Sequence, residues 1–172
     1  MTTWLQTAGR WLRRRAEDIA AAMLMTMFVA FLVQIVFRYL LNLPVGWANE
    51  TSVVLWLWLV LWGAAFVLRE DEEIRFDLLY GAVGPPVRRA MFLIAALTLI
   101  TLYTLSLPAV VDYVAFMKVE RTAYMKIRFD VLYSIYVIFA VAAIARYLYL
   151  AWRTLLGSDP RTDDPTKVSS GV

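Results

Sequence analysis

Side chains that could take part in chemistry are scarce inside the apolar stretches of this sequence. The hydroxyl and amide residues in their interiors are Thr26, Gln34, Thr98, Thr101, Thr104, Ser106 and Ser134. A path for an ion or a substrate through a membrane normally needs ionisable or clustered polar groups at mid-depth. Arg38, Glu50, Arg69 and Arg146 all fall near the ends of the apolar stretches, where long side chains reach the interface. The sequence therefore predicts neither catalytic residues nor a transport site.

Three of these hydroxyl residues, Thr98, Thr101 and Thr104, recur at about one helical turn. They could form a polar stripe against a neighbouring helix. Alternatively, each hydroxyl bonds back to a carbonyl of its own helix, as threonines in apolar helices commonly do. We favour the second interpretation.

The chain contains no cysteine and no histidine. A disulfide framework, a thiolate metal site and a histidine-ligated haem all require those residues, so all three are excluded. We therefore predict no metal ligands, no cofactor-binding residues and no enzymatic activity.

Four apolar stretches are long enough to cross a bilayer, which takes about 20 residues of helix. They lie at residues 19–37, 51–68, 91–111 and 131–151 of a 172-residue chain that is 62% hydrophobic. We predict an all-α integral membrane protein with four transmembrane helices, formed by a single domain at residues 1–156. The polar tail at residues 157–172 should be disordered. The first stretch is too long for a signal-peptide core and no small-residue cleavage site follows it, so we expect it to be retained.

Lysine and arginine are distributed unevenly around these spans. If both termini face the cytoplasm, 12 of these residues lie inside and 5 outside. The positive-inside rule then predicts cytoplasmic N and C termini, including a cytoplasmic tail.

The residues before the first span have helical spacing of apolar side chains. Trp4 and Trp11 fall on the apolar face, and Arg13 and Arg14 follow them. This pattern predicts an interfacial amphipathic helix whose tryptophans and arginines contact lipid headgroups. The alternative is a frayed chain start. A second interfacial segment is expected on the cytoplasmic side, between the second and third spans.

The first connection, at residues 39–50, is short and joins the first two spans into an antiparallel hairpin. We expect Asn49 to cap the second span and Glu50 to occupy its first turn, where the positive end of the helix favours a carboxylate. Pro108 is expected to kink the third span.

The phrase IRFDLLY at residues 74–80 returns as IRFDVLY at residues 127–133. An internal duplication is excluded, because the neighbouring helices do not repeat at the same offset. Arg75 and Arg128 are predicted to contact headgroup phosphates or a partner acid, and Asp77 and Asp130 to act as N-caps. Side chains two apart on a helix do not face each other, so an ion pair between Arg75 and Asp77 is not expected.

An ordered series of residues resembles the small membrane subunit of tripartite ATP-independent periplasmic (TRAP) transporters, the DctQ-like family. The series is Arg38-Tyr39, Asn42, Pro44, Trp47, Asn49-Glu50, Trp58, Gly63-Ala64-Ala65, Arg69 and Ile74-Arg75-Phe76-Asp77-Leu78-Leu79. The chain departs from the family pattern at Asn49, where an acid is usual, and at Glu73, where a histidine often stands. A proline common before the fourth span is also missing.

The resemblance implies a scaffold subunit in the bacterial inner membrane. Its partners would be a large membrane subunit that works as an elevator, a periplasmic substrate-binding protein and phospholipids; we expect no nucleic acid. The sodium and substrate sites would belong to the large subunit, and the transported solute would be a small organic acid.

The same resemblance suggests which residues contact partners. Trp58, Gly63 and Ala64 would pack on the large subunit. Arg38, Trp47 and Glu50 would lie at the periplasmic edge, near that subunit or the binding protein. Arg69 and Asp77 would fix the cytoplasmic edge.

Proteins with other functions also have four transmembrane spans. One is the small subunit of a tripartite tricarboxylate transporter, and another is a haem-free membrane anchor of a respiratory enzyme. A four-span sensor or assembly factor is a further alternative.

Overall fold

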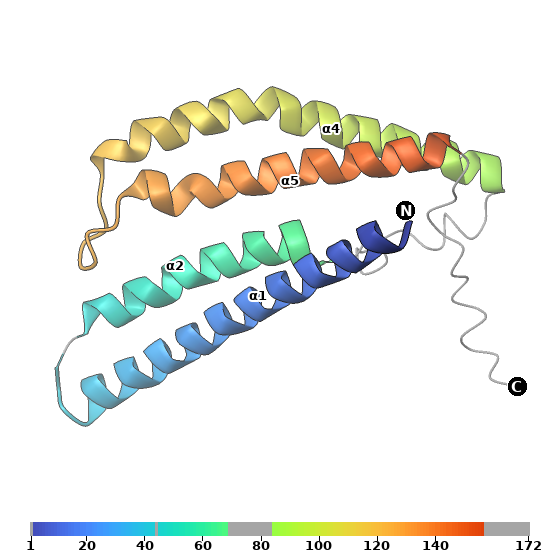
Figure 1. The fold of residues 1–172 in the computed structure, drawn as a ribbon. Helices are drawn as coiled ribbons and strands as arrows, with labels where there is room; N and C mark the ends of the chain where they lie inside the picture. The colour runs from blue at the N-terminus through green and yellow to red at the C-terminus, as the bar shows by residue number, and fades with distance from the viewer. Residues whose placement is uncertain (1, 44, 69–83, 157–172) are drawn as a thin grey trace, which may run out of the picture. The chain divides into compact units, whose positions relative to one another are not determined.

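The structure is a computed structural model that describes residues 2–43, 45–68 and 84–156, without the side chains of residues 2–8, 10 and 85. Four long helices make up almost all of the described chain (Figure 1). They are α1 (Thr2–Tyr39), α2 (Gly46–Trp62), α4 (Pro85–Phe116) and α5 (Phe129–Leu155). The π-helical turn η1 (Gly63–Val67) extends α2, and the 3₁₀ turn η2 (Met117–Val119) follows α4. The described residues contain no strand beyond one isolated bridge.

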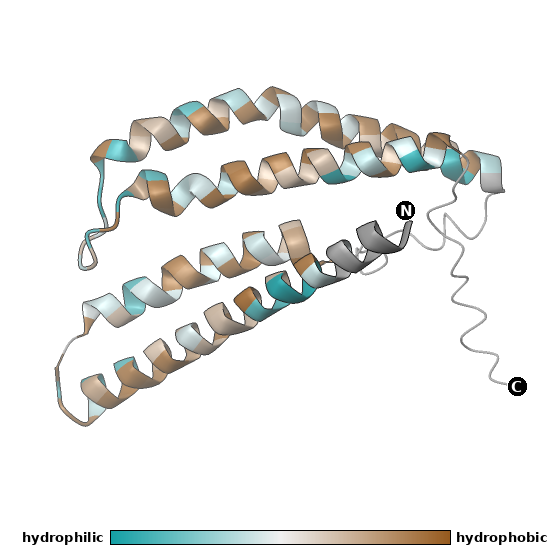
Figure 2. Cartoon of the chain, viewed as in Figure 1, coloured by the Kyte–Doolittle hydropathy of each residue, from teal (hydrophilic) through white to brown (hydrophobic). Residues whose placement is uncertain are grey.

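Three predicted spans lie within a helix that is long and apolar enough to cross a membrane, and the second, at residues 51–68, runs one residue past such a segment, Gly46–Val67. At most 22% of the most apolar window of each helix is buried inside the molecule. Large apolar side chains such as Phe28, Leu105 and Leu148 are more than half exposed. Figure 2 shows hydrophobic residues along the helices and hydrophilic ones in the N-terminal half of α1 and in the α4–α5 loop. The predicted class, an all-α protein with four transmembrane helices, is confirmed.

The N-terminal segment is helical as expected, but it is not a separate helix. The helix α1 runs from Thr2 to Tyr39 without a break. The Trp11 ring is exposed and lies under the Arg15 guanidinium at 5.5 Å. Arg13 Nε donates to Glu17 Oε1 at 2.8 Å, one helical turn away. Arg13 and Arg15 therefore have intrahelical acidic partners. The contact of Arg13 and Arg14 with lipid stays a prediction, as does that of Trp4 and Trp11.

The chain divides into two compact units, which we describe separately. The first contains residues 1–73 and 107–142, and the second contains residues 74–106 and 143–172. In the first unit α1 packs along α2 (Figure 1). Ala16, Ala30 and Ala48 are buried there, and Leu132 and Ile135 of α5 are buried in the same unit. Small residues let helix backbones approach closely in lipid, where van der Waals packing drives association.

In the second unit the buried residues are again mostly small. Ala96 of α4 and Ala143 of α5 are buried, together with Leu150 and Thr154. The Thr154 hydroxyl donates to the Leu150 carbonyl at 2.9 Å, so burying it leaves no polar group unsatisfied.

Hydroxyls within the spans bond to their own helices. Thr98 donates to the Ile94 carbonyl and Thr101 to the Leu97 carbonyl, both at 2.8 Å. Thr26 bonds in the same way to the Ala22 carbonyl, at 2.8 Å. Back-bonding is thus confirmed for Thr98 and Thr101. The helix α4 also continues through Pro108 to Phe116.

Candidate functional site

The polar groups gather at the end of the first unit where α2 begins. Two features meet there. One is a clasp between Glu50 of α2 and the loop that joins α4 to α5, at residues 120–128. The other is a hollow between α1 and α2, at the turn that connects them.

The loop at residues 120–128 is held in shape by its own hydrogen bonds. Thr122 N–H donates to the Ile127 carbonyl at 2.9 Å, and Ile127 N–H donates to Thr122 Oγ1 at 2.9 Å. Phe129 N–H closes the loop onto the Glu120 carbonyl at 3.1 Å. Lys126 turns the chain with a φ of 56°. Thr122 is buried, since only 6% of its surface is accessible.

Glu50 binds the tip of this loop. Its Oε2 accepts a hydrogen bond from Tyr124 N–H at 2.8 Å, and its carboxylate also lies 3.4 Å from Met125 N–H. Hydrogen bonds to an ionised carboxylate are stronger than neutral ones. Glu50 therefore couples the start of α2 to a loop more than 70 positions along the chain.

Neighbouring residues of α2 support the same contact. A side chain at Gly46 would collide with the Tyr124 ring, so the ring lies directly on the glycine backbone. Thr51 Oγ1 donates to the Trp47 carbonyl at 2.8 Å and lies 3.1 Å from Met125 Sδ. We call this set, Gly46, Glu50, Thr51, Tyr124 and Met125, the loop clasp.

The predicted capping of α2 is wrong. The helix begins at Gly46, with Val45 as its N-cap, and no side chain caps it. Asn49 therefore lies inside the helix, and the first turn contains no acid. The reason is that Gly46, Trp47 and Ala48 continue the helix one turn further towards the N-terminus than the apolar pattern indicates.

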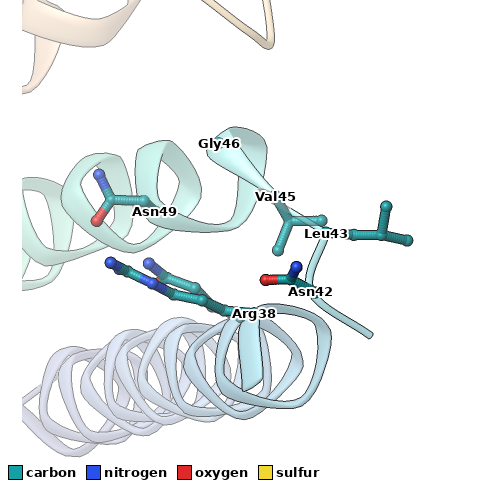
Figure 3. Close-up of a pocket in the computed structure, with 7 residues that line it drawn as sticks. Arg38, Asn42, Leu43, Val45, Gly46 and Asn49 are labelled. Carbon is teal, nitrogen blue, oxygen red and sulfur yellow. The ribbon is translucent and has the colours of Figure 1, made fainter. Parts of the chain in front are cut away.

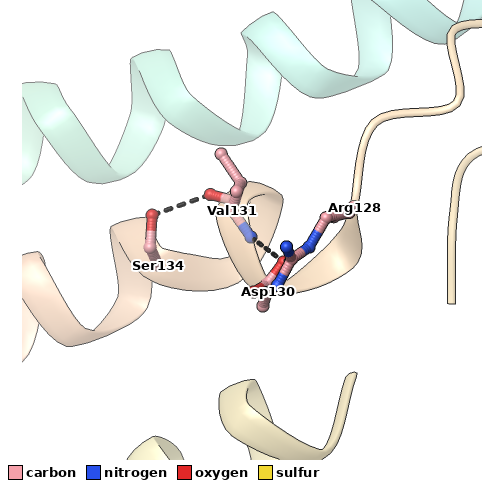
Figure 4. Close-up of polar contacts among 4 residues, drawn as sticks. All are labelled: Arg128, Asp130, Val131 and Ser134. Atoms are coloured by element: carbon pink, nitrogen blue, oxygen red, sulfur yellow. Dashed lines mark hydrogen bonds and ion pairs between the residues drawn. The ribbon is translucent and has the colours of Figure 1, made fainter. Parts of the chain in front are cut away.

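Arg128 and Asp130, in the second copy of the repeated phrase, form an ion pair (Figure 4). Arg128 Nη2 lies 2.6 Å from Asp130 Oδ2, and Asp130 Oδ1 accepts from Val131 N–H at 2.9 Å. The corresponding residues of the first copy, Arg75 and Asp77, for which no ion pair is expected, lie outside the described residues. Arg128 precedes α5, which begins at Phe129, so the helical spacing rule does not apply to it. Asp130 lies in the first turn of α5 and is not its N-cap.

The second feature is a hollow of about 560 Å³ between the end of α1 and the start of α2. Its polar lining combines Gln34, Arg38, Asn42 and Asn49. Figure 3 shows the Arg38 and Asn49 side chains in the space between the two helices, with Asn42 at the turn. We call these four residues, together with Leu43, Val45 and Gly46, the hairpin hollow.

The turn that closes the hollow depends on Asn42. Its φ is 51°, in the left-handed region that asparagine tolerates better than most residues. Leu43 N–H then reaches back to the Phe37 carbonyl at 2.9 Å. An asparagine shortly after the end of a helix is a known C-terminal signal, so the sequence alone could have indicated this role.

Trp58 is oriented into its own unit. Its indole N–H donates to the Leu132 carbonyl of α5 at 3.0 Å, and the Trp62 indole donates to the Ala16 carbonyl of α1 at 3.1 Å. These two donors are used within the chain. The packing of Trp58 on another protein stays a prediction. It concerns only the part of the ring that remains accessible.

Gly63 presents an open surface. A Cβ atom added there would meet no atom within 4 Å, so packing within this chain does not require a glycine. Val53, Trp56 and Val60 are exposed on α2, and Gly63 follows Val60 by three positions. We call these four residues the outer face of α2.

The structure says less about the remaining predicted site residues. Ala64 lies in η1, and Trp47 is 45% exposed in the first turn of α2. Arg69, Arg75 and Asp77 lie outside the described residues. The structure brings together Glu50, Trp47 and Arg38 near the same end of the α1–α2 hairpin, whereas Trp58 and Gly63 are on different faces of the α2 segment.

The arrangement is suited to binding. Among the described residues, no three acidic side chains cluster as metal ligands. Sequence reasoning missed Tyr124 and Met125 as partners of Glu50, and no local pattern indicates a contact across that separation. Gln34 was also missed, although it precedes Arg38 by one helical turn and so shares its face.

Comparison with known proteins gives two matches. The family model described as "Tripartite ATP-independent periplasmic transporters, DctQ component" matches residues 27–157. The "C4-dicarboxylate TRAP transporter small permease protein DctQ" of Vibrio cholerae serotype O1 is 27% identical over 93 residues. That alignment covers 54% of this chain and 40% of the Vibrio protein.

Proposed function

Because this chain belongs to the DctQ component family of the TRAP transporters, we propose that it acts as the scaffold subunit of one. The family consists of transporter components and not of enzymes, and the four apolar helices make this member a multi-pass membrane protein. In this role the chain holds a large membrane subunit in the bilayer while that subunit moves the solute. The match over residues 27–157 is the observation that supports the proposal most strongly.

The chemistry inside the spans favours a scaffold that holds no substrate site. Thr26, Thr98 and Thr101 satisfy their hydroxyls on their own helix backbones. Their donor protons are already used, so these hydroxyls do not offer hydrogen bonds to a carboxylate substrate. Sodium coupling and substrate binding are therefore assigned, in this proposal, to the large subunit.

The solute is proposed to be a small organic acid. The name of the Vibrio relative specifies C4-dicarboxylates for that protein. A periplasmic binding protein would deliver the solute, with the transporter in the bacterial inner membrane and both termini of this chain in the cytoplasm.

We assign the contact with the large subunit to the outer face of α2. Val53, Trp56 and Val60 are exposed, and Gly63 is open to close approach by another helix. Arg38, Trp47 and Glu50 would lie at the periplasmic edge of the complex, and Arg69 and Asp77 at the cytoplasmic edge.

The proposal is tested by replacing Gly63 with leucine. A Cβ atom there meets no atom of this chain within 4 Å, so we expect the subunit to fold, while the bulk of a leucine should block a closely packed partner helix. Gly9→Leu is the matched control, because a side chain added at this helical glycine also meets nothing within 4 Å. Tagged chain is purified from host membranes, and the co-purifying proteins are identified and quantified.

We expect the native chain and Gly9→Leu to recover a large membrane protein that Gly63→Leu recovers poorly, with all three showing equal helicity by circular dichroism. Equal recovery by Gly63→Leu would overturn the assignment of the outer face. Recovery of no large membrane protein by the native chain, or solute uptake by the chain alone in vesicles, would overturn the scaffold function itself.

A further inference from the structure

The hairpin hollow contains a cation for which the described residues provide no counter-ion. Arg38 lies at its wall, whereas the described ion pairs join Arg13 to Glu17, Arg15 to Asp18 and Arg128 to Asp130. Glu50 is the acid nearest in sequence to the hollow, but its carboxylate is directed at the N–H groups of Tyr124 and Met125. The positive charge of Arg38 is therefore not neutralised by the loop clasp.

Uncharged polar groups surround this cation. Gln34 lies one turn before Arg38 on α1, Asn49 lies on α2, and Asn42 lies in the turn (Figure 3). Each amide supplies N–H donors, and a guanidinium presents a planar set of donors that matches a phosphate or carboxylate. The first turn of α2 has no side-chain cap, which adds a weaker positive potential at the same wall. The hollow as a whole favours an oxyanion.

The chain beside the hollow is apolar and exposed: Leu43 lines the hollow, and Leu40 and Leu41 precede it in the turn. We call these three residues the leucine rim. Leu40 is 77% exposed, and Leu41 and Leu43 are each 54% exposed, directly after the helix that carries Arg38. These side chains follow the end of a membrane-spanning helix, at the depth where acyl chains meet headgroups. An anion-binding site beside exposed leucines matches a ligand that has a phosphate and a hydrocarbon chain in one molecule.

We propose that the hairpin hollow binds a phospholipid, with its phosphate on Arg38 and the amides and its acyl chains along Leu40, Leu41 and Leu43. A volume of about 560 Å³ accommodates a headgroup. A free inorganic anion would use the cation but leave the leucine rim exposed. The inference concerns the isolated chain and does not depend on the proposed scaffold function.

Detergent-purified chain tests the proposal in three titrations, with unfolding temperature and native mass spectrometry as readouts. Phosphatidylglycerol supplies phosphate and acyl chains, inorganic phosphate supplies the anion alone, and diacylglycerol supplies the chains alone. A ligand that binds the folded state raises the unfolding temperature. We expect phosphatidylglycerol to stabilise the chain and to remain bound in the mass spectrum, and the other two to do neither.

Two variants locate the site. Arg38→Gln removes the charge, and Asn42→Gly removes an amide while keeping a residue that accepts the left-handed turn. Loss of a charge-assisted contact should weaken phosphatidylglycerol binding by Arg38→Gln about tenfold or more. Arg121→Gln, at an exposed arginine of the α4–α5 loop outside the hollow, is the control and should bind as the native chain does.

Equal phosphatidylglycerol binding by Arg38→Gln and the native chain would overturn the proposal. Equal stabilisation by inorganic phosphate would show that the hollow takes a free anion. If Arg38→Gln kept its lipid but lost the large subunit on purification, the occupant would be an acid of that partner, which would also overturn the lipid site.

Discussion

Glu50 shows how the setting of one residue determines its role. A carboxylate near the start of an apolar helix is readily interpreted as a helix-end charge, yet α2 begins four residues earlier. The carboxylate instead accepts hydrogen bonds from the backbone of Tyr124 and Met125. Its contribution is to hold the α4–α5 loop against the start of α2.

Replacing Glu50 with alanine should loosen that loop. Tyr124 and Met125 N–H lose their acceptor, so the loop should open more often and trypsin should cleave at Arg121 and Lys126 several-fold faster. Limited proteolysis of the purified chain, followed by mass spectrometry, measures this rate. Glu120→Gln is the control, since Glu120 is an exposed acid of the same loop that is not part of the clasp. Equal cleavage rates for Glu50→Ala and the native chain would contradict the role of the clasp.

Asn42 is a second residue whose backbone conformation matters. Its positive φ disfavours a β-branched side chain, so Asn42→Val should destabilise the chain by about 1–2 kcal/mol, whereas Asn42→Gly should be tolerated. Unfolding in mixed detergent micelles compares the two variants. Equal stability of Asn42→Val and the native chain would mean that the turn does not depend on this conformation.

At the scale of the elements, α2 has two sides with different partners. Trp58 and Trp62 donate to carbonyls of α5 and α1, while Val53, Trp56 and Val60 are exposed. The inner side joins three helices of the first unit, and the outer side remains open to a partner in the membrane. The π-helical turn η1 ends this helix, with Leu68 N–H bonded to the Gly63 carbonyl at 2.8 Å.

The inner tryptophans can be distinguished from the outer one by replacement with phenylalanine, which removes the indole N–H together with part of the ring. Trp58→Phe should lower the free energy of unfolding by about 0.5–1 kcal/mol, because hydrogen bonds between membrane helices contribute amounts of that order. Unfolding of the chain by SDS measures the change. Trp56→Phe, at a ring that is 59% exposed, should change stability less. An equal loss at both positions would indicate that ring size and not the hydrogen bond is responsible.

At the scale of the whole molecule, the distribution of basic residues predicts that both ends of the chain face the cytoplasm. The loop clasp and the hairpin hollow would then both lie at the periplasmic side, since each is formed by a connection between an outward and an inward span. The lipid that we propose for the hollow would then come from the periplasmic leaflet of the membrane that the chain spans.

Because the chain has no cysteine, single cysteines report its orientation without background. We expect a membrane-impermeant maleimide added to spheroplasts to label Lys126→Cys and not Ser169→Cys. Both should be labelled after the membrane is permeabilised, which serves as the control. Labelling of Ser169→Cys in sealed spheroplasts would contradict the predicted orientation.

Much of the architecture follows from local properties of the sequence. Each span is specified by its own run of apolar residues, so residues 19–37, 51–68, 91–111 and 131–151 could be placed without knowing what they contact. The back-bonding of Thr98 and Thr101 is equally local, because each hydroxyl reaches a carbonyl four residues away. The ordered residues from Arg38 to Leu79 were enough to indicate the family.

Only the tertiary structure decided which polar groups meet. The Glu50 and Trp58 side chains each bond to a backbone group 74 residues away, and backbone groups carry no sequence signal. The start of α2 at Gly46 and the hairpin hollow depend on how the turn at Asn42 is closed. The length of an apolar stretch is a property of one segment of the sequence. A contact involves two segments, and the contact is fixed only when the helices pack.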